Sequence, residues 1–285
     1  MQKLPPEVNR WILEESGAEI SAQSMVGGGC INQCFHVSAG SRDFFIKLNN
    51  QDRYPGMFEA EFKGLEALAA ARTIQVPKPL NFGPDHLIIE WLESHPRHPR
   101  FWEAFGKQLA DMHRRSSKQY GFESDNYIGA LPQSNDRCKS WYEFFATRRL
   151  IPQLKLAQGS GLLDASILSG FDRIMDRLEM LLVEEAPSLL HGDLWNGNFV
   201  DGPKGLAALV DPAVYYGHRE VDLAMTQLFG GFHQDFYEAY HESFPLSPGW
   251  EQRCQLYNLY PLLVHVNLFG ASYVASVREN LKRFL

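Results

Sequence analysis

The segment HGDLWNGN, residues 191–198, is a polar loop flanked by the short apolar runs SLL and FV. The Asn-Gly pair inside it is sufficient to predict a tight turn. A turn does not also require His191, Asp193 and Asn198. The loop therefore predicts a functional site at the end of a buried strand, within a part of the chain that otherwise shows helical patterns.

Strand and helix patterns divide the chain into two parts. In the first part, strand-like runs surround the helical pattern MFEAEFKGLEALAAA, and the proline-punctuated VPKPLNFG is interpreted as a connector. SHPRHPR has two prolines and no apolar residue, so it predicts a boundary between domains of residues 1–93 and 94–285. These patterns predict an α+β fold with a small β-rich N-lobe, a larger mainly helical C-lobe and a cleft suited to a nucleotide.

Composition excludes several classes of partner and compartment. The formal net charge of −7 argues against a nucleic-acid groove or an anionic membrane surface. No run approaches the roughly 20 apolar residues of a membrane span. The first ten residues lack an apolar signal core, and the four cysteines are scattered without a CxxC pair. We therefore expect a cytoplasmic protein without nucleic-acid or membrane partners.

Lys47 and Glu61 are predicted to form an ion pair in the first lobe. Lys47 lies in the strand-like run FFIKL, on the face opposite Phe44 and Ile46. Glu61 falls within the apolar stripe of the helical pattern that begins near Met57. A buried carboxylate needs a partner, since an unpaired buried charge is very costly. Lys47 on its own would be an ordinary solvated strand lysine.

Gly27, Gly28 and Gly29 form a run between two strand-like segments. Residues without a Cβ let backbone N–H groups approach a triphosphate closely. Taken alone, the run is better explained by an ordinary hairpin turn, because glycine loops are weak signals.

Asp193, Asn198 and Asp211 have a spacing typical of phosphoryl transfer. Asp193 and Asn198 are five positions apart, as in the H-R-D-x-x-x-x-N catalytic loop of kinases. Asp211 ends the apolar run LAALV, and a β-hairpin would return it to Asn198. Mg²⁺ takes oxygen ligands, usually one or two carboxylates together with substrate phosphates. Together with the glycine run and Lys47, this order along the chain predicts phosphoryl transfer from ATP.

Five stretches resemble the fructosamine kinase (ketosamine-3-kinase) family, which is related to the aminoglycoside phosphotransferases and has a protein-kinase-like fold. They are GGGCINQ, MFEAEFKGLEAL, HGDLWNGN, DPAVYYGHREVDLAMTQLFGGF and LYNLYPLLVHVNLFG. The resemblance implies ATP- and Mg²⁺-dependent phosphorylation of the 3-hydroxyl of a ketosamine, the rearranged adduct of a sugar with an amine. The phosphate then eliminates and the amine is released, which reverses glycation of a small-molecule or protein-bound ketosamine.

The resemblance also implies roles for residues that bind the nucleotide. Lys47 would contact the α- and β-phosphates, and Glu61 would orient it. Glu90 and Leu92, in the run IIEWLE, would offer backbone groups to adenine.

In the second lobe the resemblance makes Asp193 the catalytic base and gives Mg²⁺ to Asn198 and Asp211. Asp222 would brace the catalytic loop through backbone hydrogen bonds, and His191 is expected to shape that loop. Asp211 is followed by Pro-Ala rather than Phe-Gly, and no A-P-E segment follows. A peptide-docking surface controlled by loop phosphorylation is therefore not expected.

The acceptor is predicted from the aromatic residues near HGDLWNGN. Trp195 is interpreted as a wall of the substrate site, because sugar faces pack well on aromatic rings. Phe229 and Phe232 are interpreted as core residues. An aminoglycoside or amino alcohol is the alternative acceptor, although no dense acidic cluster is present for a polycation. A pseudokinase that only binds ligands is disfavoured, because every residue expected of the catalytic site is present.

Cys30 follows the glycine run and would lie at the phosphate-binding loop. Accessible thiols near cationic groups oxidise preferentially, and members of the resembled family with a cysteine in this loop are redox-sensitive. We therefore treat Cys30 as a candidate redox switch, with a packed small side chain as the alternative. Cys34 is expected to be inert within the following strand.

Overall fold

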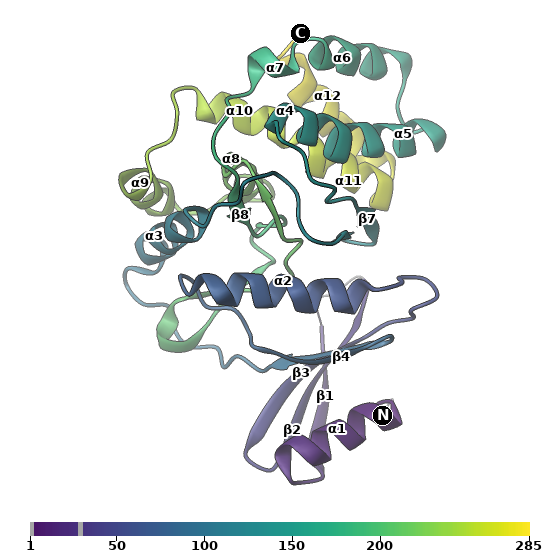
Figure 1. Ribbon diagram of the computed structural model, residues 1–285, viewed down its shortest axis with the longest axis vertical. Coiled ribbons are helices and arrows are strands. Elements are labelled where there is room, and N and C mark those ends of the chain that lie inside the picture. The colour runs from purple at the N-terminus through teal and green to yellow at the C-terminus, as the bar shows by residue number, and fades with distance from the viewer. Residues whose placement is uncertain (1–2, 28–30) are drawn as a thin grey trace.

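The protein is described by a computed structural model that covers residues 3–27 and 31–285. Figure 1 shows a lobe built around a β-sheet beneath a larger, mainly helical lobe that contains the C-terminus. Gly28, Gly29 and Cys30, three of the predicted site residues, lie outside the described residues.

The N-lobe contains a five-stranded antiparallel sheet with the order β1-β2-β3-β5-β4. The strands are β1 (Ile20–Val26), β2 (Gln33–Ala39), β3 (Arg42–Leu48), β4 (Pro79–Gly83) and β5 (His86–Glu90). Helix α1 (Pro6–Ser16) precedes the sheet, and α2 (Met57–Ala71) lies between β3 and β4 in the chain. The interpretation of VPKPLNFG as a connector was wrong, because β4 forms there. Pro79 is tolerated since it is the first residue of an edge strand.

The two faces of β3 contribute to different hydrophobic clusters. Phe44 and Ile46 are fully buried in a cluster with Val8 and Ile12 of α1. Phe45, on the opposite face, packs against a second cluster that joins residues of α2 and β5 to residues of the C-lobe. The period-two alternation of the strand thus turns the Lys47 side of the sheet toward the C-lobe.

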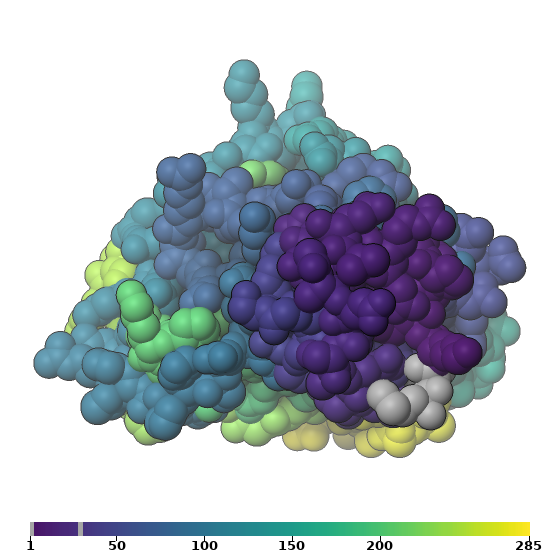
Figure 2. Space-filling model, turned by 90° about the horizontal axis from the view of Figure 1, so that it is seen from below, coloured from purple at the N-terminus to yellow at the C-terminus, as the bar shows by residue number. Residues whose placement is uncertain are grey.

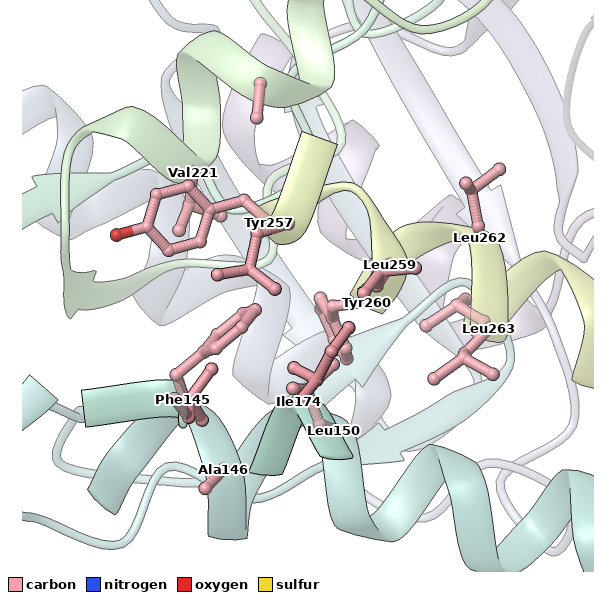
Figure 3. Packing of buried hydrophobic residues seen from close by; sticks show 14 of the residues in the cluster. Phe145, Ala146, Leu150, Ile174, Val221, Tyr257, Leu259, Tyr260, Leu262 and Leu263 are labelled. Atoms are coloured by element: carbon pink, nitrogen blue, oxygen red, sulfur yellow. The ribbon is translucent and has the colours of Figure 1, made fainter. Parts of the chain in front are cut away.

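The C-lobe is built from helices around a third hydrophobic cluster. Its helices are α3 (Phe101–His113), α4 (Trp141–Phe144), α5 (Ile151–Gly159), α6 (Ala165–Met175), α7 (Leu178–Leu181), α8 (Glu220–Thr226), α9 (Gln234–Ser243), α10 (Trp250–Tyr257), α11 (Leu259–Phe269) and α12 (Val274–Lys282), with the π-helical turn η1 (Phe145–Leu150) and the 3₁₀ turns η2 (Pro203–Gly205) and η3 (Ala271–Tyr273). In Figure 3, Phe145 and Leu150 of η1 lie opposite Tyr257, Leu259 and Leu263. The turn η1 therefore packs against the end of α10 and the first half of α11.

Six short strands pair two by two in the C-lobe. They are β6 (Asn126–Ile128) with β7 (Leu131–Gln133), β8 (Ser188–Leu190) with β11 (Tyr215–Gly217), and β9 (Phe199–Asp201) with β10 (Ala207–Leu209). The segment HGDLWNGN connects β8 to β9. It is therefore held at both ends by β structure, as the flanking apolar runs predicted.

The linker between the lobes is attached to the β9–β10 hairpin. His95 N donates to Asp201 O at 3.1 Å, and His98 N donates to Gly205 O at 2.9 Å. A Cβ on Gly205 would lie 2.2 Å from Pro96 O, so the close approach requires glycine. In Figure 2 the green segment around residue 200 lies against blue atoms of the segment near residue 100. The domain boundary between residues 93 and 94 stays a prediction.

Candidate active site

The β9–β10 hairpin brings Asp211 next to the catalytic-loop candidate. Phe199 pairs with Leu209 in the hairpin, and Val210 N donates to Asn198 O at 3.0 Å. Asp211 then turns out of the strand direction in a left-handed conformation with φ of 54°. Such a backbone is uncommon for a non-glycine residue and is found at functional sites. The hairpin return predicted from the spacing of Asn198 and Asp211 is present.

Asp222 holds the start of HGDLWNGN through backbone hydrogen bonds. Its carboxylate accepts from His191 N at 2.7 Å and from Gly192 N at 2.9 Å. A third donor is His113 Nε2 at 3.2 Å, and His113 Nδ1 in turn accepts from the Tyr240 hydroxyl at 2.8 Å. The carboxylate is fully buried, and its three donors compensate for its lost hydration. The expected bracing contact is therefore present, whereas no sequence pattern pointed to the support from His113 and Tyr240.

Hydrogen bonds determine the tautomer of His191. Its Nδ1 lies 3.2 Å from Asp193 N, which can only donate, so Nδ1 is an acceptor. Its Nε2 lies 2.9 Å from Val210 O, which can only accept, so Nε2 carries the proton. Burial lowers the pKa of His191, and the ring stays neutral at physiological pH. His191 is therefore suited to shaping the loop rather than to acid–base chemistry.

Asp193 and Asn198 form the centre of the loop. Asn198 Nδ2 donates to the main-chain oxygen of Asp193 at 2.8 Å and to its Oδ2 at 2.9 Å. Burial raises the pKa of Asp193 to about 7; the Asn198 hydrogen bond opposes this shift, while the charges of Asp211 and Asp222 add to it. A carboxyl group with a pKa near neutrality suits a general base, because it is ionised at the working pH yet basic enough to take a proton.

Lys47 bridges two carboxylates across the cleft. Its Nζ lies 2.6 Å from Glu61 Oε1 and 2.6 Å from Asp211 Oδ1. Burial of the Lys47 side chain favours deprotonation, but the attraction of Asp211 and Glu61 outweighs it and raises the pKa of Lys47. The ammonium is therefore charged at physiological pH. The predicted Lys47–Glu61 pair is present, whereas the contact with Asp211 was not foreseen.

Asn198 and Asp211 have the chemistry that a magnesium ion requires. The Asn198 amide nitrogen is fixed by two acceptors, so its Oδ1 is the atom left for a ligand. The Asp211 side chain is 51% exposed, and only its Oδ1 bonds to Lys47 among the described residues. Residues 3–27 and 31–285 contain no cluster of three or more His, Cys, Asp or Glu side chains suited to a metal. Mg²⁺ needs no such cluster when phosphates and waters complete its shell, so these two residues fit the ion.

An apolar cavity of about 260 Å³ lies between the lobes. Its walls include Phe45 and Ile89 from the sheet and Val200 and Val210 from the hairpin, and the segment from Glu90 to Leu92 forms part of its border. Gly27 and Asp211 also line it. Flat apolar walls beside free backbone groups suit a purine base. Glu90 N already donates to Lys78 O at 2.9 Å. The predicted adenine contacts would therefore use Glu90 O and Leu92 N.

The aromatic residues of this part of the chain separate into two groups. Tyr215 is fully buried, with the Arg149 guanidinium 4.0 Å from its ring centroid, and Phe232 is a core residue as expected. The interpretation of Phe229 as core was wrong, because its side chain is 42% exposed. Its ring meets Trp195 edge-on, with centroids 5.9 Å apart. The reason is that α8 ends at Thr226, so Phe229 lies in the following loop, where its backbone is left-handed with φ of 54°.

Comparison with known proteins decides the family. The family model described as fructosamine kinase matches residues 5–285. The chain belongs to the fructosamine kinase family. Among the relatives of this family member, a probable ketoamine kinase of Synechocystis sp. is 42% identical over 93% of this chain and 91% of that protein. The chloroplastic protein-ribulosamine 3-kinase of Arabidopsis thaliana is 39% identical over 98% of this chain and 87% of that protein.

Solved structures agree with this family assignment. The "putative fructosamine-3-kinase" of Thermobifida fusca has a TM-score of 0.90 and 35% identity over 97% of this chain and 98% of that one. A thermostable mutant of aminoglycoside phosphotransferase APH(4)-Ia, in complex with AMP-PNP and hygromycin B, has a TM-score of 0.65 at 15% identity over 98% of this chain and 99% of that one. The second likeness concerns the fold alone. The predicted family, the two-lobed kinase-like fold and the assignment as an ATP-dependent phosphotransferase are confirmed.

Proposed function

We propose that this protein phosphorylates the 3-hydroxyl of ketosamines, with Asp193 as the catalytic base. The observation that carries the proposal is the hydrogen bond from Asn198 Nδ2 to Asp193 Oδ2, in a loop that also carries Trp195, whose ring meets that of Phe229. The relatives named ketoamine kinase and protein-ribulosamine 3-kinase support the choice of acceptor. Each aromatic ring packed on a sugar face contributes about 0.5–1.5 kcal/mol at best, so the rings select the class of substrate rather than drive the reaction.

The proposed reaction assigns a separate task to each side chain. The apolar cavity holds adenine, and Lys47 contacts the α- and β-phosphates while Glu61 keeps it in place. Asp193 accepts the proton of the substrate O3–H as O3 attacks the γ-phosphorus. The new O3–P bond forms while the bond from that phosphorus to the β,γ-bridging oxygen breaks, so ADP leaves with the electron pair.

Asn198 Oδ1 and the Asp211 carboxylate would hold Mg²⁺ in this site. When bound, the ion neutralises charge on the phosphate oxygens. Asp211 has one carboxylate oxygen for this purpose even while the other contacts Lys47.

A second candidate function is phosphorylation of an aminoglycoside or amino alcohol on the same fold. A panel of acceptors with ATP and Mg²⁺, followed by coupled ADP release, distinguishes the two. We expect turnover with fructosamine- and ribulosamine-type acceptors and a mass increase of one phosphoryl group on the sugar. Turnover confined to aminoglycosides or amino alcohols contradicts the ketosamine assignment, and nucleotide binding without any turnover supports the pseudokinase alternative.

The partners and location that accompany this function remain proposals. The acceptor is a free or protein-bound ketosamine, in the cytoplasm and without nucleic-acid or membrane partners. The net charge of −7 supports the absence of polyanionic partners. No helix within residues 3–27 and 31–285 is long and apolar enough to cross a bilayer. Fractionation of the native host distinguishes a cytoplasmic from an organellar location.

A further inference from the structure

A group of five rings extends from the catalytic loop across the C-lobe. It consists of Trp195, Phe229, His265, Phe269 and Tyr273, and we call it the aromatic cluster. The ring centroids of Phe229 and His265 are 4.8 Å apart, and those of His265 and Tyr273 are 4.9 Å apart. Trp195 is two positions after Asp193, so the cluster begins beside the proposed base.

The cluster is exposed in a way that packing alone does not explain. Phe229 is 42% and Phe269 is 51% exposed. Phe229 adopts its left-handed backbone within a loop where Gly230 and Gly231 also have positive φ, and Asn196 Nδ2 donates to Gly231 O at 3.1 Å to fix that loop on the catalytic loop. A non-glycine residue in this conformation costs of order 1 kcal/mol or more and persists where the surroundings enforce it, typically at ligand sites.

His265 adds one defined hydrogen-bond acceptor to the cluster. Its Nδ1 lies 2.7 Å from Pro261 O, which can only accept, so Nδ1 carries the proton of the neutral ring. Its Nε2 then has a lone pair that accepts no hydrogen bond from the described residues. Burial lowers the pKa of His265, which favours this neutral form. The cluster thus offers aromatic faces and a neutral acceptor but no positive charge.

We propose that the aromatic cluster binds the protonated amine of the ketosamine and so selects amine-bearing sugars over neutral ones. This inference rests on the proposed function. Four covalent bonds join O3 to the amine nitrogen at C1, so a substrate with O3 at Asp193 places its amine near the catalytic loop. An ammonium group is attracted by aromatic faces, and its N–H bonds need an acceptor, which Nε2 of His265 supplies.

The test compares two acceptors that differ in one atom. One is 1-deoxy-1-propylamino-D-fructose, which carries an ammonium group near neutral pH, and the other is 1-O-propyl-D-fructose, which is neutral. We expect the wild-type kcat/KM to favour the amine by about tenfold, the scale of one or two cation–π contacts. Equal kcat/KM values for the two acceptors in the wild type would overturn the inference without any variant.

Variants then assign the preference to the cluster. Phe229→Leu and His265→Leu should raise KM for the amine with little change in KM for the ether, and His265→Gln should recover much of the loss because its side chain keeps an acceptor. Tyr142→Leu, at a similarly exposed ring outside the site, should change neither value. Equal losses for amine and ether would mean that the cluster packs on the sugar or supports the fold only. Failure of the wild type on both sugars, with turnover of another acceptor, would instead refute the proposed function.

Discussion

Lys47 and Asp211, which are 164 positions apart in the chain, form an ion pair of 2.6 Å across the cleft between the lobes. The same ammonium lies 2.6 Å from Glu61 of α2. Lys47 is also the residue proposed to contact the phosphates, and Asp211 is proposed to hold the metal. When Asp211 also holds the metal, Glu61 is the partner that serves only to keep the buried Lys47 charged and in place.

Glu61→Gln should therefore weaken nucleotide use rather than acceptor use. The amide removes one of two charges that hold Lys47, so we expect KM for ATP to rise about tenfold, the scale of one partly buried charge contact. Glu59→Gln on the same helix is a matched control, because Glu59 pairs with Lys63 at the surface. Steady-state kinetics at varied ATP would contradict this account if both variants behaved alike.

Asp211→Ala should abolish the magnesium dependence of nucleotide binding. The substitution deletes the carboxylate proposed as a ligand and leaves Lys47 with Glu61 alone. Calorimetry with ATP, with and without Mg²⁺, should show little difference between the two conditions. Asp235→Ala, at an exposed position of α9, is the control and should keep the wild-type difference. An unchanged affinity for MgATP in Asp211→Ala would remove this residue from the metal site.

The redox prediction for Cys30 can be tested without interference from the other cysteines, because they are unreactive. Among the described residues the other three cysteines are free and buried. Burial raises the pKa of Cys34 to about 11 and also raises the pKa values of Cys138 and Cys254, so these thiols are poor nucleophiles. Oxidant should lower wild-type activity, dithiothreitol should restore it, and Cys30→Ala should be resistant. An equal loss of activity in both proteins would leave Cys30 a packing residue.

Asp193 should make the fold less stable as the pH rises. Its pKa in the folded protein, about 7, lies above its ordinary value of 3.8. Between these values the folded state keeps a proton that the unfolded state releases, so the free energy of unfolding falls as the pH rises through this window. Because the carboxyl group is partly exposed, we expect Asp193→Asn to be more stable than wild type by about 1–3 kcal/mol at pH 8 and by little at pH 4.

Denaturant unfolding at both pH values measures this difference. Asp235→Asn, at an exposed position, should show no comparable gain. A variant Asp193→Asn that is no more stable than wild type at pH 8 would mean that the Asp193 carboxylate carries little desolvation cost.

Short-range patterns predicted much of the site. The loop between two apolar runs and the hairpin return to Asp211 depend on spacing within about twenty residues, where chain geometry restricts the possibilities. The Lys47–Glu61 pair was predictable as well, because a carboxylate within an apolar helical stripe must find a cation. The β4 strand was not, since its prolines mimic a connector and only its position at the sheet edge permits them.

Contacts that depend on the docking of the lobes were not predictable. The Lys47–Asp211 pair joins two elements whose relative position is set by the shared hydrophobic cluster, not by any local pattern. The apolar pattern continues through Phe229 in the sequence, but α8 ends at Thr226 and Phe229 lies in the loop that follows, with a left-handed backbone. His265 looks like a core histidine in an apolar run, and the free Nε2 is evident only once Nδ1 is seen bonded to Pro261.

The most direct measurement of the central claim is single-turnover phosphoryl transfer to a ketosamine by wild type and Asp193→Asn across pH 5–9. We expect the wild-type rate to rise with pH and level off above an apparent pKa of about 7, the value of the Asp193 carboxyl group. Asp193→Asn should bind MgATP normally but transfer its phosphoryl group about 10²- to 10⁴-fold more slowly, without this pH dependence. A near-normal rate in the variant, or the same pH profile in both proteins, would contradict the assignment of Asp193 as the base that activates the 3-hydroxyl.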